Sequence, residues 1–252
     1  MRARWGQTLA LAGVSVVLLT PLFGLMAPVG AWRWSASSTP SALATSFTLT
    51  GLALVIVVLA GTPLAWSLRT APKPVRTAFE AVVLLSVLMP PLALGLLLML
   101  AFGPQSALGV LLLRLGIPTS NSTPAFVATQ VYASFGYYLL AASAAFNAVP
   151  RELEHSAALL GLGPWAVFRR VTLPLARLGL ATAVSLAWVR ALGEFGAIMV
   201  TSYYPHGMPV QLWVDLQDRG LSAVLPLLVV FLLTALPLPW ILHLLSNRAH
   251  RA

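Results

Sequence analysis

Six long apolar runs constrain the fold of this sequence more than any other feature. About 20 largely apolar residues cross a bilayer as one helix, because a helix rises ~1.5 Å per residue and the hydrocarbon is ~30 Å thick. Runs of this length lie at about 8–29, 44–68, 78–102, 125–147, 177–200 and 221–245. We therefore predict an all-α integral membrane protein with six transmembrane helices in one domain over residues 1–252.

The composition supports this class and excludes several others. Hydrophobic residues make up 59% of the chain and charged residues 8%, whereas a soluble domain carries about 25% charge. Without cysteine, the chain has no disulfide, thiolate metal site or cysteine nucleophile. Its net charge of +9 is a feature of nucleic-acid-binding proteins, but here the basic residues flank the apolar runs, so we expect a membrane lipid environment and no nucleic acid.

The lysine and arginine positions predict how the chain crosses the membrane, because cytoplasmic loops are enriched in these residues. With a cytoplasmic N-terminus, Arg33, Arg114 and Arg219 lie outside and Arg190 lies within a span. The other eleven lie on the cytoplasmic side: Arg2, Arg4, Arg69, Lys73, Arg76, Arg151, Arg169, Arg170, Arg177, Arg248 and Arg251. Both termini are therefore predicted to be cytoplasmic. The run at 8–29 is longer than the apolar part of a secretory signal, about 7–15 residues, so we favour a retained helix.

A polar stretch, RELEHSAALLGLGPWAVFRRVTLP at residues 151–174, lies in the cytoplasmic loop predicted at 148–176. It follows Pro150, a residue suited to the start of a helix. Glu152 and Glu154 fall in the first turn, where the positive end of the helix dipole favours carboxylates. The stretch therefore indicates a short helix at its beginning.

Gly161 and two prolines predict how this stretch continues. Glycine adopts the left-handed conformation without strain, so Gly161 is suited to ending the first helix. Pro164 is suited to opening a second helix, which we expect Pro174 to end. The residues alone are compatible with two short helices meeting near Gly161, or with a basic amphipathic loop on anionic lipid headgroups.

The spacing of this stretch resembles the cytoplasmic loop of importer-type ABC-transporter permeases. That loop has the pattern E-A-A, three residues, G, nine residues, I-x-L-P, and the same register runs here from His155 to Pro174. The histidine and Ser156 replace the usual glutamate and first alanine, with Glu154 immediately before. The resemblance implies that the loop docks on a separate ATP-binding subunit. The residues expected in this contact are Glu152, Glu154, His155, Ser156, Ala157, Gly161, Val171, Leu173 and Pro174.

Two opposite charges lie inside the fifth apolar run. Arg190 and Glu194 are four residues apart, so a helix carries them on one face. Charges within a membrane are costly and normally face the bundle interior with a partner. We predict a structural ion pair that orients this helix, or a part of an anion path in which Glu194 tunes the field of Arg190. The two roles are compatible.

The segment around this pair, RALGEFGA at 190–197, resembles the fifth-helix signature of molybdate, tungstate and sulfate permeases. The following PVQLWVDLQDRGLSAVLPL at 209–227 resembles the same branch. The resemblance implies the type I importer fold in a bacterial or archaeal cytoplasmic (inner) membrane. It also implies a homodimer with two ABC ATP-binding subunits and an extracytoplasmic substrate-binding protein. The expected cargo is molybdate or tungstate, with sulfate or thiosulfate as the alternative.

Polar side chains on two other runs are candidates for lining the path, although such residues also mediate helix packing. They are Ser46, Thr48, Thr50, Thr129, Gln130 and Ser134. The chain has no phosphate-binding G-x-x-x-x-G-K-[ST] loop, so ATP and magnesium are expected on the partner subunit. The four histidines show no metal-ligand spacing. We expect no cofactor, metal or catalytic residue in this chain. The alternative class is an intramembrane enzyme on lipid-linked substrates, with Arg190 and Glu194 catalytic.

Overall fold

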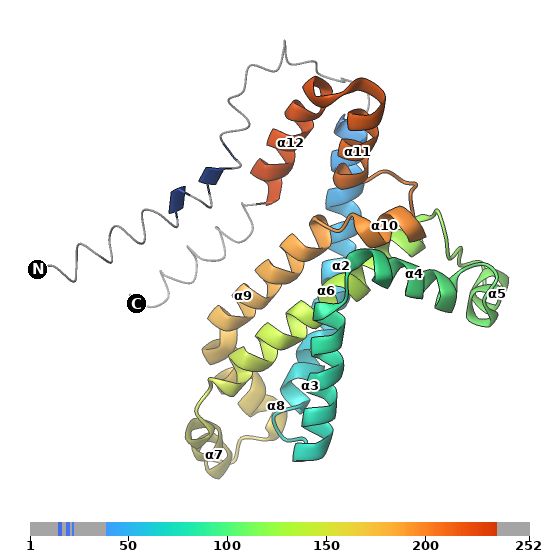
Figure 1. The fold of residues 1–252 in the computed structure, drawn as a ribbon. Coiled ribbons are helices and arrows are strands. Elements are labelled where there is room, and N and C mark those ends of the chain that lie inside the picture. Colours follow the sequence, from blue (N-terminus) through green and yellow to red (C-terminus); the bar gives the residue numbers. More distant parts are fainter. Residues whose placement is uncertain (1–14, 17–18, 21, 23–38, 236–252) are drawn as a thin grey trace, which may run out of the picture.

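The computed structural model describes residues 39–235 and five residues between positions 15 and 22. The described chain is helical throughout, which confirms the predicted all-α class for this part (Figure 1). The elements are α2 (Thr39–Ser67), α3 (Lys73–Leu88), α4 (Pro91–Phe102), α5 (Ala107–Arg114), α6 (Thr123–Asn147), α7 (Arg151–Leu159), α8 (Pro164–Val167), the π-helix η2 (Phe168–Thr172), α9 (Leu173–Leu192), α10 (Gly196–Thr201), α11 (Met208–Arg219) and α12 (Leu221–Ala235). The predicted span at 8–29 and the end of the last span, from 236 on, lie outside the described residues.

The core lies where α2, α6 and α9 pack side by side. Tyr138 and Phe146 of α6 are fully buried there, together with small residues of α9 such as Ala183 and Ala187. Small residues let helices approach closely in a membrane protein. Gly179 is the clearest case, because a Cβ on it would lie 2.4 Å from the Cβ of Ala145. The α6–α9 contact therefore requires glycine at this position.

Two helices among the described residues are long and apolar enough to cross a membrane, Thr39–Ser67 and Pro164–Leu192. The bent pair α3 and α4 would make a third span. Helix α6 covers the run predicted at 125–147, and α12 is a shorter apolar helix. Six spans and cytoplasmic termini therefore stay predictions.

The predicted helix over 78–102 is not a single straight helix. It consists of α3 and α4, which are bent by 111° at Met89–Pro90. Proline lacks the N–H that would continue a helix and disfavours the helical conformation of the residue before it, so the pair Pro90–Pro91 ends α3 and starts α4. The run predicted as one helix is therefore two helices that meet at these prolines.

The prediction of one helix over 177–200 is wrong. Helix α9 ends at Leu192, and α10 begins at Gly196 after a short break. Helix α10 packs against α4, so the two broken segments lie together (Figure 1). Their backbones are very close, because a Cβ on Gly95 would lie 2.8 Å from the Cα of Ala197.

The prediction that Pro174 ends a short helix is also wrong. The chain is helical without a sharp break from Pro164 to Leu192. The π-helical turn at Phe168–Thr172 precedes the proline, and the Leu173 N–H donates to the Phe168 carbonyl five residues earlier. Pro174 then lies in the first turn of α9, where a missing N–H costs little. The loop helix and the fifth apolar run therefore form one continuous element.

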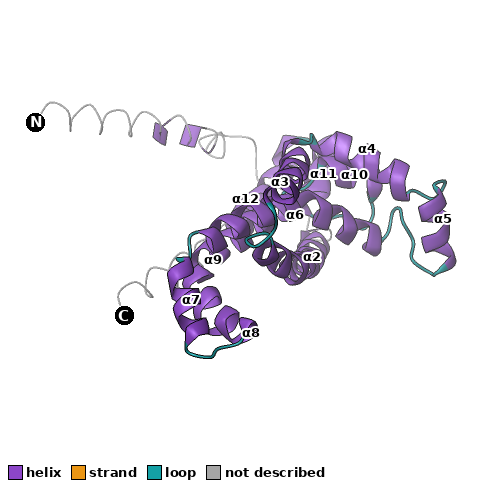
Figure 2. Ribbon diagram, turned by 90° about the horizontal axis from the view of Figure 1, so that it is seen from below, coloured by secondary structure: helices purple, strands orange, loops and turns teal. Residues whose placement is uncertain are grey.

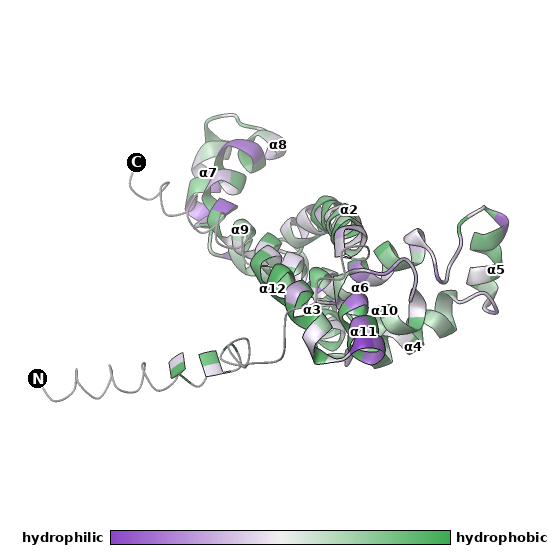
Figure 3. Cartoon of the chain, turned by 90° about the horizontal axis from the view of Figure 1, so that it is seen from above, coloured by the Kyte–Doolittle hydropathy of each residue, from purple (hydrophilic) through white to green (hydrophobic). Residues whose placement is uncertain are grey.

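The polar parts of the chain lie at opposite ends of the long helices. Helices α7 and α8 project together away from the other helices (Figures 1 and 2). Helix α11 lies at the other end of the long helices, beside the start of α2 (Figure 1). Hydrophilic stretches are visible on α7 and α11, whereas α12 is mostly hydrophobic (Figure 3). Charged and polar surface is therefore concentrated away from the apolar middle, as a membrane protein requires.

We predict that Gly179→Ala destabilises the protein by about 1–3 kcal/mol, because the new methyl group overpacks the α6–α9 contact. The matched control is Gly51→Ala on α2, where an added Cβ meets no atom within 4 Å. That variant should stay within about 1 kcal/mol of the original chain. Thermal unfolding of the detergent-solubilised protein measures both, and equal melting temperatures for the two variants would contradict the close approach.

Candidate functional site

The loop at 148–176 contains the first of the two predicted short helices, α7, whereas the second, which begins at Pro164, continues into α9. Helix α7 ends at Leu159, and Gly161 follows with a φ of +87°. The Gly161 N–H donates to the Ala158 carbonyl at 2.9 Å and the Leu162 N–H to the Ala157 carbonyl at 3.3 Å. These two bonds form the Schellman motif, which satisfies carbonyls at the end of a helix. The predicted role of Gly161 as a helix terminator is confirmed.

Large apolar side chains are exposed where the two helices meet. Leu159 is 89% exposed, Leu160 85% and Trp165 67%. We call these three residues the apolar tip. The ring of Trp165 stacks on Phe168 at a centroid distance of 5.4 Å, which fixes its position relative to the base of α9. Exposed apolar clusters on a rigid, projecting element are typical of a docking surface.

Glu154, and not His155, bonds to both neighbouring segments of this loop, the turn after α2 and the start of α9. The carboxylate of Glu154 accepts a hydrogen bond from Arg69 at 2.6 Å and another from the Thr172 hydroxyl at 2.5 Å. His155 is exposed and lines a hollow between α7 and the end of α2. The residue before the motif position therefore holds the loop, while His155 is left on the surface.

The remaining predicted loop residues occupy three environments. Ala157 is buried on the inner face of α7. Val171 and Leu173 are half-buried in the turn that leads into α9. The others are exposed, and they are Glu152, Ser156, Gly161 and Pro174. The sequence did not single out Arg69 or Thr172, although Arg69 was counted among the cytoplasmic charges.

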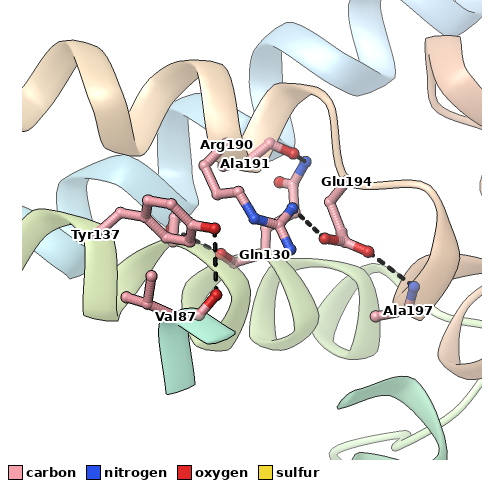
Figure 4. Close-up of polar contacts among 8 residues, drawn as sticks. Val87, Gln130, Tyr137, Arg190, Ala191, Glu194 and Ala197 are labelled. Atoms are coloured by element: carbon pink, nitrogen blue, oxygen red, sulfur yellow. Dashed lines mark hydrogen bonds and ion pairs between the residues drawn. The ribbon is translucent and has the colours of Figure 1, made fainter. Parts of the chain in front are cut away.

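The intramembrane charges form the predicted ion pair (Figure 4). Arg190 donates through Nη1 to Oε2 of Glu194, and the other carboxylate oxygen accepts the Ala197 N–H at 2.7 Å. Glu194 is 1% exposed and lies in the break after α9, so it also caps the first turn of α10. The Arg190 guanidinium lies 5.6 Å from the ring centroid of Tyr137, at the distance of a cation–π contact.

This geometry explains why Arg190 and Glu194 are present in an apolar segment without assigning them a catalytic role. Each oxygen of Glu194 accepts a hydrogen bond from the protein itself, so the carboxylate has a structural role as ion-pair partner and helix cap. The positive charge of Arg190 is stabilised by the Glu194 carboxylate and by the ring face of Tyr137, and the Arg190 side chain is 19% exposed. The pair joins the end of α9 to the start of α10 and stabilises the break between them.

Most of the predicted path residues are buried in contacts between helices. Gln130 of α6 donates to the Ala191 carbonyl of α9 at 3.0 Å (Figure 4). It also donates to Thr50 of α2 at 2.9 Å, so it bridges three helices. Thr129 shares a hydrogen bond with Thr201 at 2.7 Å. These contacts match the packing role that such residues often have.

The other three path candidates differ in their surroundings. Ser46 is buried and accepts the Met208 N–H at 2.8 Å, which joins α2 to α11. Ser134 is buried and donates to the backbone carbonyl of Gln130. Thr48 is exposed. A role in lining a path stays a prediction for all six residues. In the part of the chain that the structure describes, no three His, Cys, Asp or Glu side chains gather as a metal site.

Removing Glu194 tests the ion pair. We predict that Glu194→Ala lowers the free energy of unfolding by about 3–5 kcal/mol, because Arg190 is then left partly buried without its partner. Adding Arg190→Met should recover part of this loss, since no unpaired charge remains. Denaturant unfolding in micelles measures both effects. The control is Arg76→Gln, which breaks an exposed pair with Glu80 and should cost about 0.5 kcal/mol or less. A loss from Glu194→Ala as small as this control would refute a stabilising pair.

Residues 57–251 match the family described as binding-protein-dependent transport system inner membrane component. A probable molybdenum ABC transporter permease of Haloferax volcanii is 35% identical, over 96% of this chain and 90% of that protein. The molybdenum transport system permease protein ModB of Mycobacterium tuberculosis is 32% identical, over 90% of this chain and 89% of its own length. The molybdate/tungstate transport system permease WtpB of Thermococcus kodakarensis is 30% identical, over 80% of this chain and 76% of its own length.

Solved structures share the fold at lower identity. A chain of a bacterial ABC transporter that imports alginate matches with a TM-score of 0.75 and 18% identity, covering 98% of this chain and 96% of that chain. The methionine ABC transporter MetNI matches with a TM-score of 0.57 and 16% identity, covering 84% of this chain and 93% of that chain. Together with the family match over most of the sequence, these likenesses show that the chain belongs to the family of binding-protein-dependent transport system inner membrane components.

Proposed function

We propose that this chain is the permease subunit of an ATP-driven ABC importer for a tetrahedral oxyanion, either molybdate or tungstate. The identity of the transported oxyanion is inferred from curated relatives at 30–35% identity over most of their length, which are named for transport of molybdenum, molybdate or tungstate. The proposed assembly is a homodimer of six-helix subunits of the type I importer fold, with both termini cytoplasmic. Two ATP-binding subunits and an extracytoplasmic binding protein complete it.

The apolar tip supports a docking role for the loop at 148–176. Leucine and tryptophan side chains at this exposure gain free energy when a partner covers them, about 1.5–3 kcal/mol for each fully buried side chain. The loop is rigid, because α7 is capped by a Schellman motif and α8 continues into α9. When the ATP-binding subunits close, they pull the tip, and the continuous helix from Pro164 to Leu192 carries that movement into the membrane.

The ion pair of Arg190 with Glu194 is compatible with a transport path that binds the anion only weakly. An arginine with free N–H groups binds an oxyanion through strong bidentate hydrogen bonds. Here the Glu194 carboxylate accepts a hydrogen bond from Nη1 and offsets the positive charge of Arg190, which lowers the attraction of the guanidinium for a dianion. Selection of the cargo then rests with the extracytoplasmic binding protein. The sulfate and enzyme alternatives have weaker support, because the matched relatives are named for molybdenum transport and both oxygens of Glu194 are engaged.

Reconstitution tests this proposal. The chain is placed in proteoliposomes with a candidate ABC ATPase and a candidate oxyanion-binding protein from the same organism, and ATP is supplied on the ATPase side. We expect ATP-dependent uptake of molybdate or tungstate, measured by mass spectrometry of the vesicle metal content, and little uptake of sulfate. A complex without ATP is the control. Uptake that ignores ATP, or a complex that imports sulfate in preference to both metal oxyanions, would contradict the proposal.

A further inference from the structure

Arg69 is a buried cation that the sequence did not place in the loop's machinery. It lies in the turn after α2 and is 7% exposed, and it is the only Lys or Arg among the described residues that is buried. Lysine and arginine are almost never fully buried without partners. Its position therefore depends on what surrounds it, and the two groups that its side chain contacts, Glu154 and the Val149 carbonyl, belong to or flank α7.

Three hydrogen bonds join Arg69 to the start of α7. Its Nη1 donates to Oε1 of Glu154 at 2.6 Å, and its Nη2 donates to the Val149 carbonyl at 3.0 Å. In return, the Arg69 carbonyl accepts a hydrogen bond from Nη2 of Arg151 at 2.8 Å. Because the bonds run in both directions and involve side chains and backbone, they fix α7 in distance and in orientation relative to the end of α2.

The same carboxylate also reaches the base of α9. The hydroxyl of Thr172, in the π-helical turn, donates to the Glu154 oxygen that Arg69 contacts, at 2.5 Å. Thr172 is 1% exposed. Glu154 therefore joins three segments: the end of α2, helix α7 and the turn that begins α9.

Apart from these hydrogen bonds, helix α7 has few apolar contacts with the rest of the protein. Of its nine residues only Ala157 is buried, whereas Leu153 and Leu159 are exposed. A helix with one small buried side chain gains little from burial, so its polar contacts determine where it lies. The Glu154 contacts are the ones that tie it to both neighbouring membrane helices.

We propose that Arg69 is a positioning residue for coupling, because it links α7 through Glu154 to the end of α2. In this chain Glu154 makes that link, and His155, at the usual position of the motif glutamate, does not. A pull on the apolar tip then moves α2 and α9 together, because both are bonded to one carboxylate. Without Arg69, α7 moves independently of α2. The conformational changes of the ATPase subunits then no longer move the membrane helices. This inference rests on the proposed function.

Two measurements on the reconstituted complex test it. The first is the number of oxyanions imported per ATP hydrolysed. The second is the distance distribution between spin labels at Thr70→Cys and Ala158→Cys, which is straightforward because the chain contains no cysteine of its own. We expect Arg69→Met to lower imported oxyanion per ATP by ~10-fold and to broaden the label distances, with basal ATP hydrolysis retained. Arg69→Lys should recover part of both, since an ammonium group still pairs with Glu154.

The control is Arg76→Gln, because Arg76 forms an exposed pair with Glu80 and is not part of the proposed contact. It should leave both measurements unchanged. If Arg69→Met does not insert, Glu154→Gln and Thr172→Val weaken the same contact with less change of shape, and both should lower the transport ratio. Normal coupling and unchanged label distances in every inserted variant, beside a wild-type complex that imports, would overturn the role of Arg69. A wild-type complex that imports no oxyanion would instead overturn the proposed function.

Discussion

A buried charge in an apolar chain needs a partner within hydrogen-bond distance, and two arginine–carboxylate pairs of this kind determine how the protein is connected. Arg190 and Glu194 stabilise the break between α9 and α10 in the middle of the molecule. Arg69 and Glu154 join the end of α2 to the loop helix at one end of it. In each pair the carboxylate also accepts a neutral donor, the Ala197 N–H or the Thr172 hydroxyl. The pairs therefore fix the relative positions of helices as well as neutralising charge.

One continuous helical element connects these two pairs, because it carries Arg190 and also Thr172, which contacts Glu154. The segment from Pro164 to Leu192 starts beside the apolar tip, passes Thr172 near its base and carries Arg190 near its end. The π-helical turn at Phe168–Thr172 keeps the segment helical up to Pro174. Under the proposed function, this continuous helix would carry a movement of the loop to the break after α9, where α10 packs against α4.

Local patterns in the sequence predicted the parts of the structure that depend on near neighbours. Gly161 ends α7 because only glycine takes its left-handed conformation without strain, and the pairing of Arg190 with Glu194 follows from a spacing of four residues. The runs around α2 and α6 were found because burial in lipid requires length and apolar character, both of which are visible in one dimension.

Contacts between distant segments were not predictable in the same way. The prolines mark where α3 ends, but neither the 111° angle of the bend nor the packing of α4 against α10, with Gly95 close to Ala197, is visible in the sequence. The contact of Arg69 with Glu154 joins residues 85 positions apart, and the motif spacing drew attention to His155 instead. Buried polar side chains such as Thr50 and Gln130 are of the types that line a transport path. Only the fold shows that they hydrogen-bond to one another.

The central claim is that the loop at 148–176 transmits the ATPase cycle to the membrane helices. The most direct test is Gly161→Val, because a β-branched residue at a φ of +87° distorts the junction of α7 and α8 while the membrane helices are untouched. We predict that this variant inserts normally, that ATP hydrolysis by the complex no longer responds to the loaded binding protein, and that oxyanion uptake is lost. Wild-type uptake by the inserted Gly161→Val protein would contradict the account.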